Sequence, residues 1–268
     1  MNYNIRFSCV SHVGKSRKIN QDNFLCNGYY MQVEKNQVSS SVQGEISLKN
    51  NPVIMGIFDG LGGEECGEVA SYIAARNFSR AIFSENIIFD LEKLYFDTNE
   101  KICDYITENQ LRSMGTTAAA LVFAKKEIIL SNIGDSKIFL FSNKKLEQIS
   151  KDHVIDTLMF VGKSPLTQNL GIPSSELIIE PYIARGYYNK GDVYLICSDG
   201  LTDMLTMKEI ENILSNHAFE KVSSILLDRA LENGGKDNIT IIVCQITNKL
   251  NCLLKRLVNK RMRKVYGA

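Results

Sequence analysis

Short apolar runs separated by polar turns dominate the chain and predict a protein rich in β-strands. A continuous apolar run of this kind is typical of a strand that is buried on both faces. The runs cover residues 5–13, 23–33, 53–58, 117–123, 127–133, 137–141, 177–183, 193–198 and 239–246. Those between 117 and 149 follow one another too closely for crossover helices, so we expect antiparallel hairpins there.

Apolar residues at helical spacing predict four helices, at 64–83, 90–110, 207–215 and 219–232. Residues 34–52 are polar and without clear periodicity, and we interpret them as a loop or a loose hairpin. Residues 151–176 are also weakly patterned, and we interpret them as a surface excursion near the site. Strand-rich stretches interrupted by helix pairs favour a layered α+β fold over a doubly wound parallel sheet.

Bulk composition narrows the class of protein. A chain of 268 residues with 44% hydrophobic content can bury a sizeable core, and we expect one domain over residues 1–247. With a net charge of +1, the overall electrostatics of the protein favour binding neither to nucleic acid nor to a membrane. Seven irregularly spaced cysteines without a CxxC pair fit a reducing compartment. The sequence begins without an apolar signal core and contains no apolar run long enough to span a membrane. We therefore expect a cytoplasmic protein, and we also expect a monomer.

Residues 248–268 differ from the rest of the chain in charge. They contain seven lysines and arginines and no acid, and their leucines, valines and methionine fit one face of a helix. One interpretation is a basic amphipathic helix that docks on a partner or on an anionic membrane surface. The other is a helix that packs on its own domain and exposes a solvated basic face. Both interpretations stay open at this point.

Acidic residues mark the ends of the apolar runs. Asp59, Asp135 and Asp199 each end a run, and Asp237 directly precedes one. If a sheet brings such acids to one edge, their charges repel one another unless cations are present. Hard divalent cations prefer oxygen ligands of this kind. The pattern therefore predicts a carboxylate-lined metal site.

Seven motifs, taken together and in order, carry a family resemblance. They are Gly14–Asp22, Phe58–Gly63, Gly115–Thr117, Ile133–Lys137, Asp152–His153, Cys197–Asp203 and Gly235–Thr240. Their identity, order and spacing resemble the PPM family, the metal-dependent type 2C protein serine/threonine phosphatases, in its bacterial form. The resemblance covers about residues 5–246. It implies a four-layer α-β-β-α sandwich of two antiparallel sheets flanked by helices.

The resemblance also implies a role for each matching position. Asp59 would bridge two Mn²⁺ or Mg²⁺ ions, and the Gly60 carbonyl would bind one of them. Asp199 and Asp237 would bind the other ion, while Asp22 would join directly or through water. Asp135, with Asp199, would form a weaker third metal site. Arg17 would hold the substrate phosphate through its planar, charged guanidinium. Supporting positions near these ligands would be Asn238, Asp203 and Thr116.

The implied reaction is hydrolysis of phosphoserine and phosphothreonine by a metal-bridging hydroxide, in opposition to a serine/threonine kinase. The chain departs from the family at Leu61, where some members carry a proton-donating histidine, and at Gln21, which is often glutamate. The excursion at 152–171 is also shorter than in bacterial members, which predicts a more open site. These departures leave a second hypothesis, a catalytically weak scaffold that binds phosphoproteins or a kinase. A phosphoesterase acting on nucleotides or nucleic acid is disfavoured by the neutral net charge.

Overall fold

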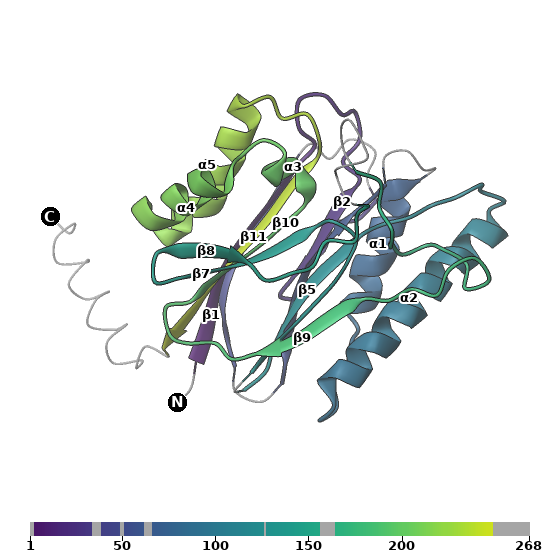
Figure 1. Ribbon diagram of the computed structural model, residues 1–268, viewed down its shortest axis with the longest axis horizontal. Helices are drawn as coiled ribbons and strands as arrows, with labels where there is room; N and C mark the ends of the chain where they lie inside the picture. Colours follow the sequence, from purple (N-terminus) through teal and green to yellow (C-terminus); the bar gives the residue numbers. More distant parts are fainter. Residues whose placement is uncertain are drawn as a thin grey trace, which may run out of the picture.

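Two antiparallel sheets stacked face to face form the centre of the fold, as Figure 1 shows. The computed structural model describes residues 3–33, 39–48, 51–61, 66–125, 127–155 and 164–248. The six-stranded sheet has the spatial order β3 (Ser39–Ser47), β1 (Tyr3–His12), β11 (Ile239–Asn248), β10 (Val193–Cys197), β7 (Lys137–Ser142) and β8 (Lys145–Gln148). The five-stranded sheet has the order β2 (Asp22–Cys26), β4 (Val53–Asp59), β5 (Ala118–Phe123), β6 (Ile128–Ile133) and β9 (Tyr182–Gly186).

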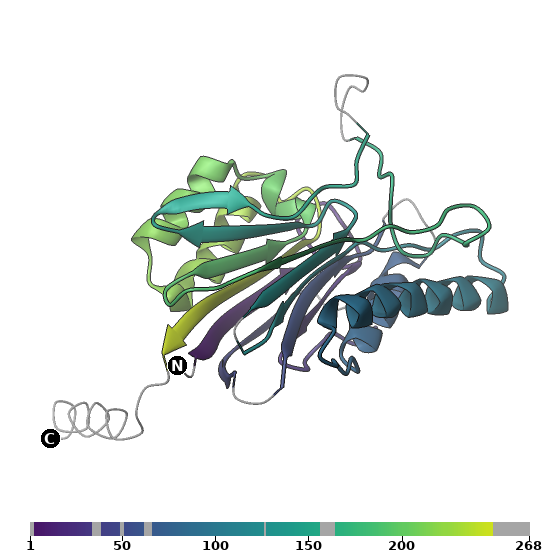
Figure 2. The same cartoon turned by 60° about the horizontal axis from the view of Figure 1, so that its bottom comes forward.

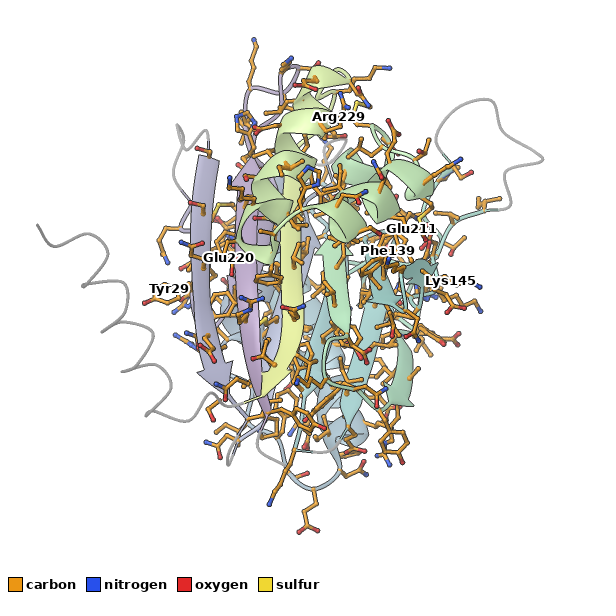
Figure 3. The ribbon with its side chains drawn as sticks, turned by 90° about the vertical axis from the view of Figure 1, so that its left-hand side faces the viewer. Tyr29, Phe139, Lys145, Glu211, Glu220 and Arg229 are labelled. Atoms are coloured by element: carbon orange, nitrogen blue, oxygen red, sulfur yellow. The ribbon has the colours of Figure 1, made fainter. Side chains whose placement is uncertain are left out.

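Helices cover the outer face of each sheet. On the five-stranded sheet lie α1 (Gly67–Phe78) and α2 (Ile87–Glu108), and Figure 2 shows them on one side of the paired sheets. On the six-stranded sheet lie α3 (Asp199–Thr202), α4 (Met207–Asn216) and α5 (Phe219–Glu232), which Figure 3 shows from outside. The expected four-layer α-β-β-α sandwich is therefore confirmed. No helix in the described ranges is long and apolar enough to cross a membrane.

Three apolar layers explain the continuous apolar runs in the sequence. Along β10, Tyr194 and Ile196 face the core between the sheets, while Val193, Leu195 and Cys197 face the core beneath α4 and α5. Both faces of the strand are buried, so polar and apolar residues do not alternate along it. The same holds for β5, whose six residues are all buried.

Several element boundaries differ from the sequence predictions. The segment 34–52, interpreted as a loop or a loose hairpin, contains the edge strand β3, in which only Ser40, Val42 and Ile46 are partly buried. The predicted strand 23–33 ends at Cys26, because Asn27 and Gly28 turn the chain with φ of 53° and 80°. The predicted strand 177–183 lies later, at β9, and the short β8 and α3 were not predicted. Of the basic segment 248–268, residues 249–268 lie outside the described residues.

Candidate functional site

Asp22 and Asp59 face each other at one end of the five-stranded sheet. Asp22 is the first residue of β2 and Asp59 is the last residue of β4, and the antiparallel register places them directly opposite one another. Directly opposed residues in an antiparallel pair have Cβ atoms about 5 Å apart. Two carboxylates at that spacing repel each other, so this position favours a bound cation.

Asp22 is held by hydroxyl groups of the other sheet. Its Oδ2 accepts hydrogen bonds from Ser198 Oγ at 2.8 Å and from Thr240 Oγ1 at 2.7 Å. Its Oδ1 is buried without a hydrogen-bond partner. Burial raises the pKa of Asp22 to about 6, the two hydroxyls oppose this, and the charge of Asp237 adds to the rise. A divalent cation would relieve both the burial of this charge and the repulsion.

Asp59 and Gly60 are fixed by backbone contacts. The Asp59 carbonyl oxygen accepts hydrogen bonds from Thr117 N at 2.8 Å and from Thr116 Oγ1 at 2.9 Å. The Gly60 N–H donates to the carbonyl oxygen of Gln21 at 3.1 Å. The Asp59 side chain itself is half-buried at the edge of the sheet. The acid is therefore carried on rigid backbone, as a ligand or catalytic group requires.

Replacing Gly60 with alanine should destabilise this turn. A Cβ at Gly60 would lie 2.3 Å from the Gly67 carbonyl oxygen and 2.5 Å from that of Gln21. Both are backbone atoms, so β4 and the start of α1 would have to separate. We expect Gly60→Ala to lower the free energy of unfolding by about 1–3 kcal/mol in denaturant titration. Gly186→Ala is the matched control, since its Cβ would meet only Ile128 Cγ2 at an ordinary 3.6 Å; equal losses in both variants would contradict the argument.

Asp199 and Asp237 enter the site from the six-stranded sheet. Asp199 begins α3 directly after β10 and is 5% exposed. Asp237 precedes β11, and its neighbour Asn238 organises the surrounding loops. The Asn238 side chain accepts from Gln21 N at 2.8 Å and donates to the carbonyl oxygens of Val13 and Ile19 at 2.9 and 3.0 Å. Asn238 therefore fixes the loop that carries Arg17 beside Asp237.

Arg17 lies among the acids. Its Nη2 is 2.8 Å from Asp237 Oδ2, and its side chain is 42% exposed. The hydrogen bond to Asp237 is the main cause of its raised pKa, and the charges of Asp237, Asp59 and Asp22 add to it. A guanidinium in this position is close to three carboxylates and still open to solvent. It can therefore meet an anionic group that approaches from outside.

Asp135 lies at the same end of the sandwich, between β6 and β7. The turn at Gly134 has φ of 95°, and Ser136 Oγ is 2.7 Å from Thr117 Oγ1. Thr117 Oγ1 also accepts a hydrogen bond from Asp59 N at 3.1 Å, so this chain of contacts links the two turns. Asp135 is 7% exposed. The fold thus places every acid of the predicted ligand set at one end.

The carboxylates share this end without forming a closed ligand set. In the part of the chain that the structure describes, no three His, Cys, Asp or Glu side chains converge into a group that could hold a metal as they stand. The donor atoms nevertheless fit a hard cation, since they are carboxylate oxygens and Asp22 Oδ1 is buried without a donor. One of these acids, Asp237, is paired with Arg17 at 2.8 Å.

The excursion between 151 and 176 leaves the sheet near the same turns. His153 N donates to the Gly134 carbonyl oxygen at 2.9 Å. The two arms pair where Ile155 N meets the Pro165 carbonyl oxygen at 3.0 Å and Thr167 N meets that of His153 at 2.8 Å. Residues 156–163 lie outside the described residues, so our expectation of a more open site stays a prediction.

Two site residues were missed at the level of sequence. Ser198 and Thr240 hold Asp22, and neither was a candidate. Each lies inside or beside a buried apolar run, in the strings LICSDG and DNITII. A hydroxyl in such a run must find a partner, because a buried polar group without one is costly. That signal could have identified both.

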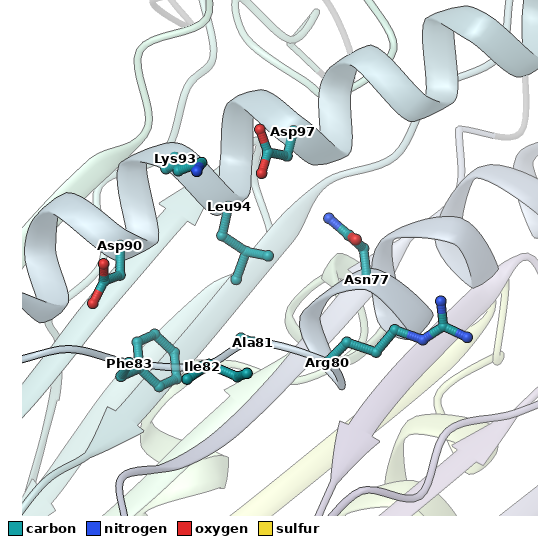
Figure 4. A pocket seen from close by; sticks show the side chains of 9 residues that line it. All are labelled: Asn77, Arg80, Ala81, Ile82, Phe83, Asp90, Lys93, Leu94 and Asp97. Carbon is teal, nitrogen blue, oxygen red and sulfur yellow. The ribbon is translucent and has the colours of Figure 1, made fainter.

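A pocket of about 270 Å³ lies elsewhere, between the end of α1, the following loop and α2 (Figure 4). Its lining mixes apolar and charged side chains, among them Ile82, Leu94, Arg80 and Asp97. None of the predicted site residues lines it. The pocket is therefore separate from the carboxylate end of the sandwich.

Comparison with known proteins gives a consistent result. The profile of the family described as Protein phosphatase 2C matches residues 42–240. The chain is 30% identical over 221 residues to the serine/threonine phosphatase Stp of Listeria welshimeri, covering 75% of this chain and 88% of Stp. It is 30% identical over 208 residues to the serine/threonine protein phosphatase PstP of Mycobacterium tuberculosis, covering 73% of this chain and 40% of PstP.

Solved structures agree with the sequence matches. The Mycobacterium tuberculosis phosphatase PstP/Ppp superposes with a TM-score of 0.74 at 25% identity, over 91% of this chain and 100% of that one. A PstP catalytic domain in complex with two manganese ions has the same fold, with a TM-score of 0.73 at 24% identity over 92% of this chain and 100% of that one. The chain therefore belongs to the protein phosphatase 2C family and is a serine/threonine phosphatase of the bacterial type.

Proposed function

We propose that the chain hydrolyses phosphoserine and phosphothreonine in proteins with two divalent ions, Mn²⁺ or Mg²⁺, held at the carboxylate end of the sandwich. The observation that carries this proposal is the position of Asp22, which lies opposite Asp59 in the sheet and accepts hydrogen bonds from Thr240 and Ser198 of the other sheet at 2.7 and 2.8 Å. Ligands from both sheets share one end there. The manganese complex of PstP supports the choice of ion.

The proposed ligands are Asp59, the Gly60 carbonyl, Asp199, Asp237 and Asp22. Bound ions of this kind supply Lewis acidity and activate water for in-line attack on phosphorus. Asp135 and Asp199 are the proposed ligands of a weaker third ion. Asn238 keeps the Asp237 loop against residues 13–21, and so sets where the ligands and Arg17 meet.

Arg17 is the proposed phosphate-binding group. It lies within 2.8 Å of a proposed metal ligand, and its side chain is 42% exposed, so a phosphoryl group can reach it from solvent. Its charge would stabilise the equatorial oxygens as negative charge develops there. Leu61 carries no proton to give, so the leaving serine or threonine oxygen takes its proton from water.

The proposed physiological role is to reverse the action of a serine/threonine kinase on proteins of the cytoplasm. Cys9, Cys26, Cys103, Cys197 and Cys244 form no disulfide, which is usual in a reducing compartment. The alternative of a catalytically weak scaffold is not favoured, because all four proposed side-chain ligands, Asp22, Asp59, Asp199 and Asp237, are acids. We keep the expectation that the enzyme is a monomer.

Hydrolysis of a phosphothreonine peptide with and without Mn²⁺ tests this proposal. We expect turnover with Mn²⁺, loss of turnover with a chelator, and recovery when Mn²⁺ is returned in excess. Calorimetric titration of the chelator-treated protein with Mn²⁺ should show binding that does not depend on turnover. A nucleoside monophosphate under the same conditions is the matched alternative substrate. No turnover in a folded protein that binds Mn²⁺ would contradict the proposal, as would preference for the nucleotide.

A further inference from the structure

Two loops meet beside Arg17 at the carboxylate end of the sandwich. One joins β1 to β2 and the other joins α5 to β11, and Figure 1 shows them side by side. Lys15 N, in the first loop, donates to the Gly235 carbonyl oxygen of the second at 2.7 Å. Asn238 donates two further hydrogen bonds from the second loop to carbonyl oxygens of the first. Together with the pairing of Arg17 and Asp237, these contacts make the two loops one fixed unit.

The two loops carry four cations and a single acid. Besides Arg17 they contain Lys15, Lys18 and Lys236, which are all exposed and which we call the site lysines. The acid, Asp237, is paired with Arg17. No site lysine forms an ion pair with another residue that the structure describes. The charge of the three lysines is therefore available to a ligand.

Two glycines let the stems of two site lysines lie close to the joined loops. A Cβ at Gly235 would be 3.4 Å from Lys15 Cγ, and a Cβ at Gly234 would be 3.7 Å from Lys236 Cγ. Lysine commonly packs its aliphatic stem on the protein and keeps its ammonium group in water. These two lysines are thus held at the loops while their charges face solvent.

The acids next to the two loops do not offset this charge. Glu232, at the end of α5, is paired with Arg229 at 3.0 Å. Asp22, where β2 begins, is 2% exposed and accepts hydrogen bonds from two hydroxyl groups. Bound divalent ions would balance the charge of the proposed metal ligands. The loops therefore give the surface beside Arg17 a positive potential.

We propose that the site lysines select phosphoproteins in which acidic residues flank the phosphorylated serine or threonine. This inference rests on the proposed function and adds the sequence class of its substrate. With the phosphoryl group at Arg17, neighbouring residues of an extended substrate follow at about 3.5 Å each, so that roughly two or three on either side come within reach of a lysine. Acidic residues there are attracted, whereas lysines and arginines are repelled.

A nucleic acid is the other polyanion that a positive surface attracts. Single-stranded nucleic acid is bound largely through bases that stack on aromatic side chains. Residues 13–21 and 233–238, which form the two loops, contain no phenylalanine, tyrosine or tryptophan. The lysines also accompany a single guanidinium, which matches one phosphoryl group. The chemistry therefore favours an acidic phosphopeptide.

Three phosphothreonine peptides of equal length test this inference, with glutamate, alanine or lysine on both sides of the phosphothreonine. We expect kcat/KM with Mn²⁺ to be at least about tenfold higher for the glutamate peptide than for the lysine peptide, with the alanine peptide between them. Raising the ionic strength from about 0.05 M to about 0.5 M should narrow this ratio, because salt screens exposed charges. Lys18→Glu/Lys236→Glu, with one substitution in each loop, should lower the ratio at least about tenfold.

Lys145→Glu/Lys190→Glu is the matched control, because it makes the same charge change on exposed residues at the opposite end of the sandwich. Lys145 pairs with Ser142, the last residue of β7, and Lys190 precedes β10. Asp135 and Asp199 lie at the other ends of these two strands. This variant should keep both the kcat/KM values and the glutamate-to-lysine ratio of the wild type.

Binding of phosphonate analogues separates this inference from the proposed function. Fluorescence anisotropy with Mn²⁺ measures the affinity of the same three peptides when a non-hydrolysable phosphonate replaces the phosphate. The glutamate peptide should again bind at least about tenfold more tightly than the lysine peptide. Equal affinities, or a ratio that Lys18→Glu/Lys236→Glu leaves unchanged, would overturn the inference, as would tighter binding of a single-stranded oligonucleotide. Absence of turnover with all three phosphopeptides would count against the proposed function alone.

Discussion

Asp199→Asn should lower kcat toward a phosphothreonine peptide by roughly three orders of magnitude, or about 4 kcal/mol of activation free energy. The substitution keeps the shape of the side chain and removes its charge. Asp199 is a proposed metal ligand and is 5% exposed at the start of α3, so water cannot easily replace its carboxylate oxygen. The affinity for Mn²⁺, measured by calorimetric titration, should fall together with kcat.

The control for this experiment is Asp228→Asn, which removes an acid from an exposed position on α5. It should leave both kcat and Mn²⁺ affinity unchanged. Thermal unfolding of both variants without metal checks that each is folded. Near-normal turnover in Asp199→Asn would remove this residue from the ligand set.

Asp22 should make the metal-free protein less stable at neutral pH than in mild acid. Its pKa is raised from 3.8 to about 6, first by burial and then by the charge of Asp237. The folded protein therefore holds this proton to a higher pH than the unfolded chain does. The contribution of Asp22 to the free energy of unfolding is fully present below pH 3.8 and is lost as the pH rises through about 6. The loss amounts to about 3 kcal/mol.

Denaturant titrations of chelator-treated wild type and Asp22→Asn, between pH 4 and pH 8, measure this contribution. The asparagine can still accept from Ser198 and Thr240 but never ionises. We expect the variant to be the more stable protein by about 3 kcal/mol at pH 7.5 and the difference to shrink toward pH 4. Added Mn²⁺ should reverse the order at neutral pH, because the ion stabilises the charged wild-type side chain. A difference that does not vary with pH would contradict the raised pKa.

The sequence was most informative where a strand is buried on both faces. The runs that became β4, β5, β6, β10 and β11 were located to within about two residues, because their short length and flanking turn residues are typical of buried strands. The edge strand β3 was missed because it packs on one neighbour only and carries serines on its outer positions. Its pairing with β1 depends on backbone hydrogen bonds, which leave no mark on side-chain composition.

The acidic residues of the candidate site were proposed from the sequence, whereas the residues that hold them in place were not. Asp59 and Asp199 were visible because each ends an apolar run, and Asp237 because it directly precedes one. Ser198 and Thr240 could be identified only as buried hydroxyl groups in need of a partner, because that partner, Asp22, belongs to the other sheet. No local pattern indicates which strands will face each other. The pairing of Arg17 with Asp237, across 220 positions, was hidden for the same reason.

The bonds to Asp22 also set a limit on when this enzyme can become active during its synthesis. Asp22 depends on Ser198 and Thr240, which lie 176 and 218 positions later in the chain. β1, among the first strands to leave the ribosome, pairs over ten residues with β11, the last strand described. Until β11 has emerged, Asp22 and Asp59 are present without their counterparts. A nascent chain that ends before β11 therefore lacks Thr240, one of the two residues whose hydroxyl groups hold Asp22.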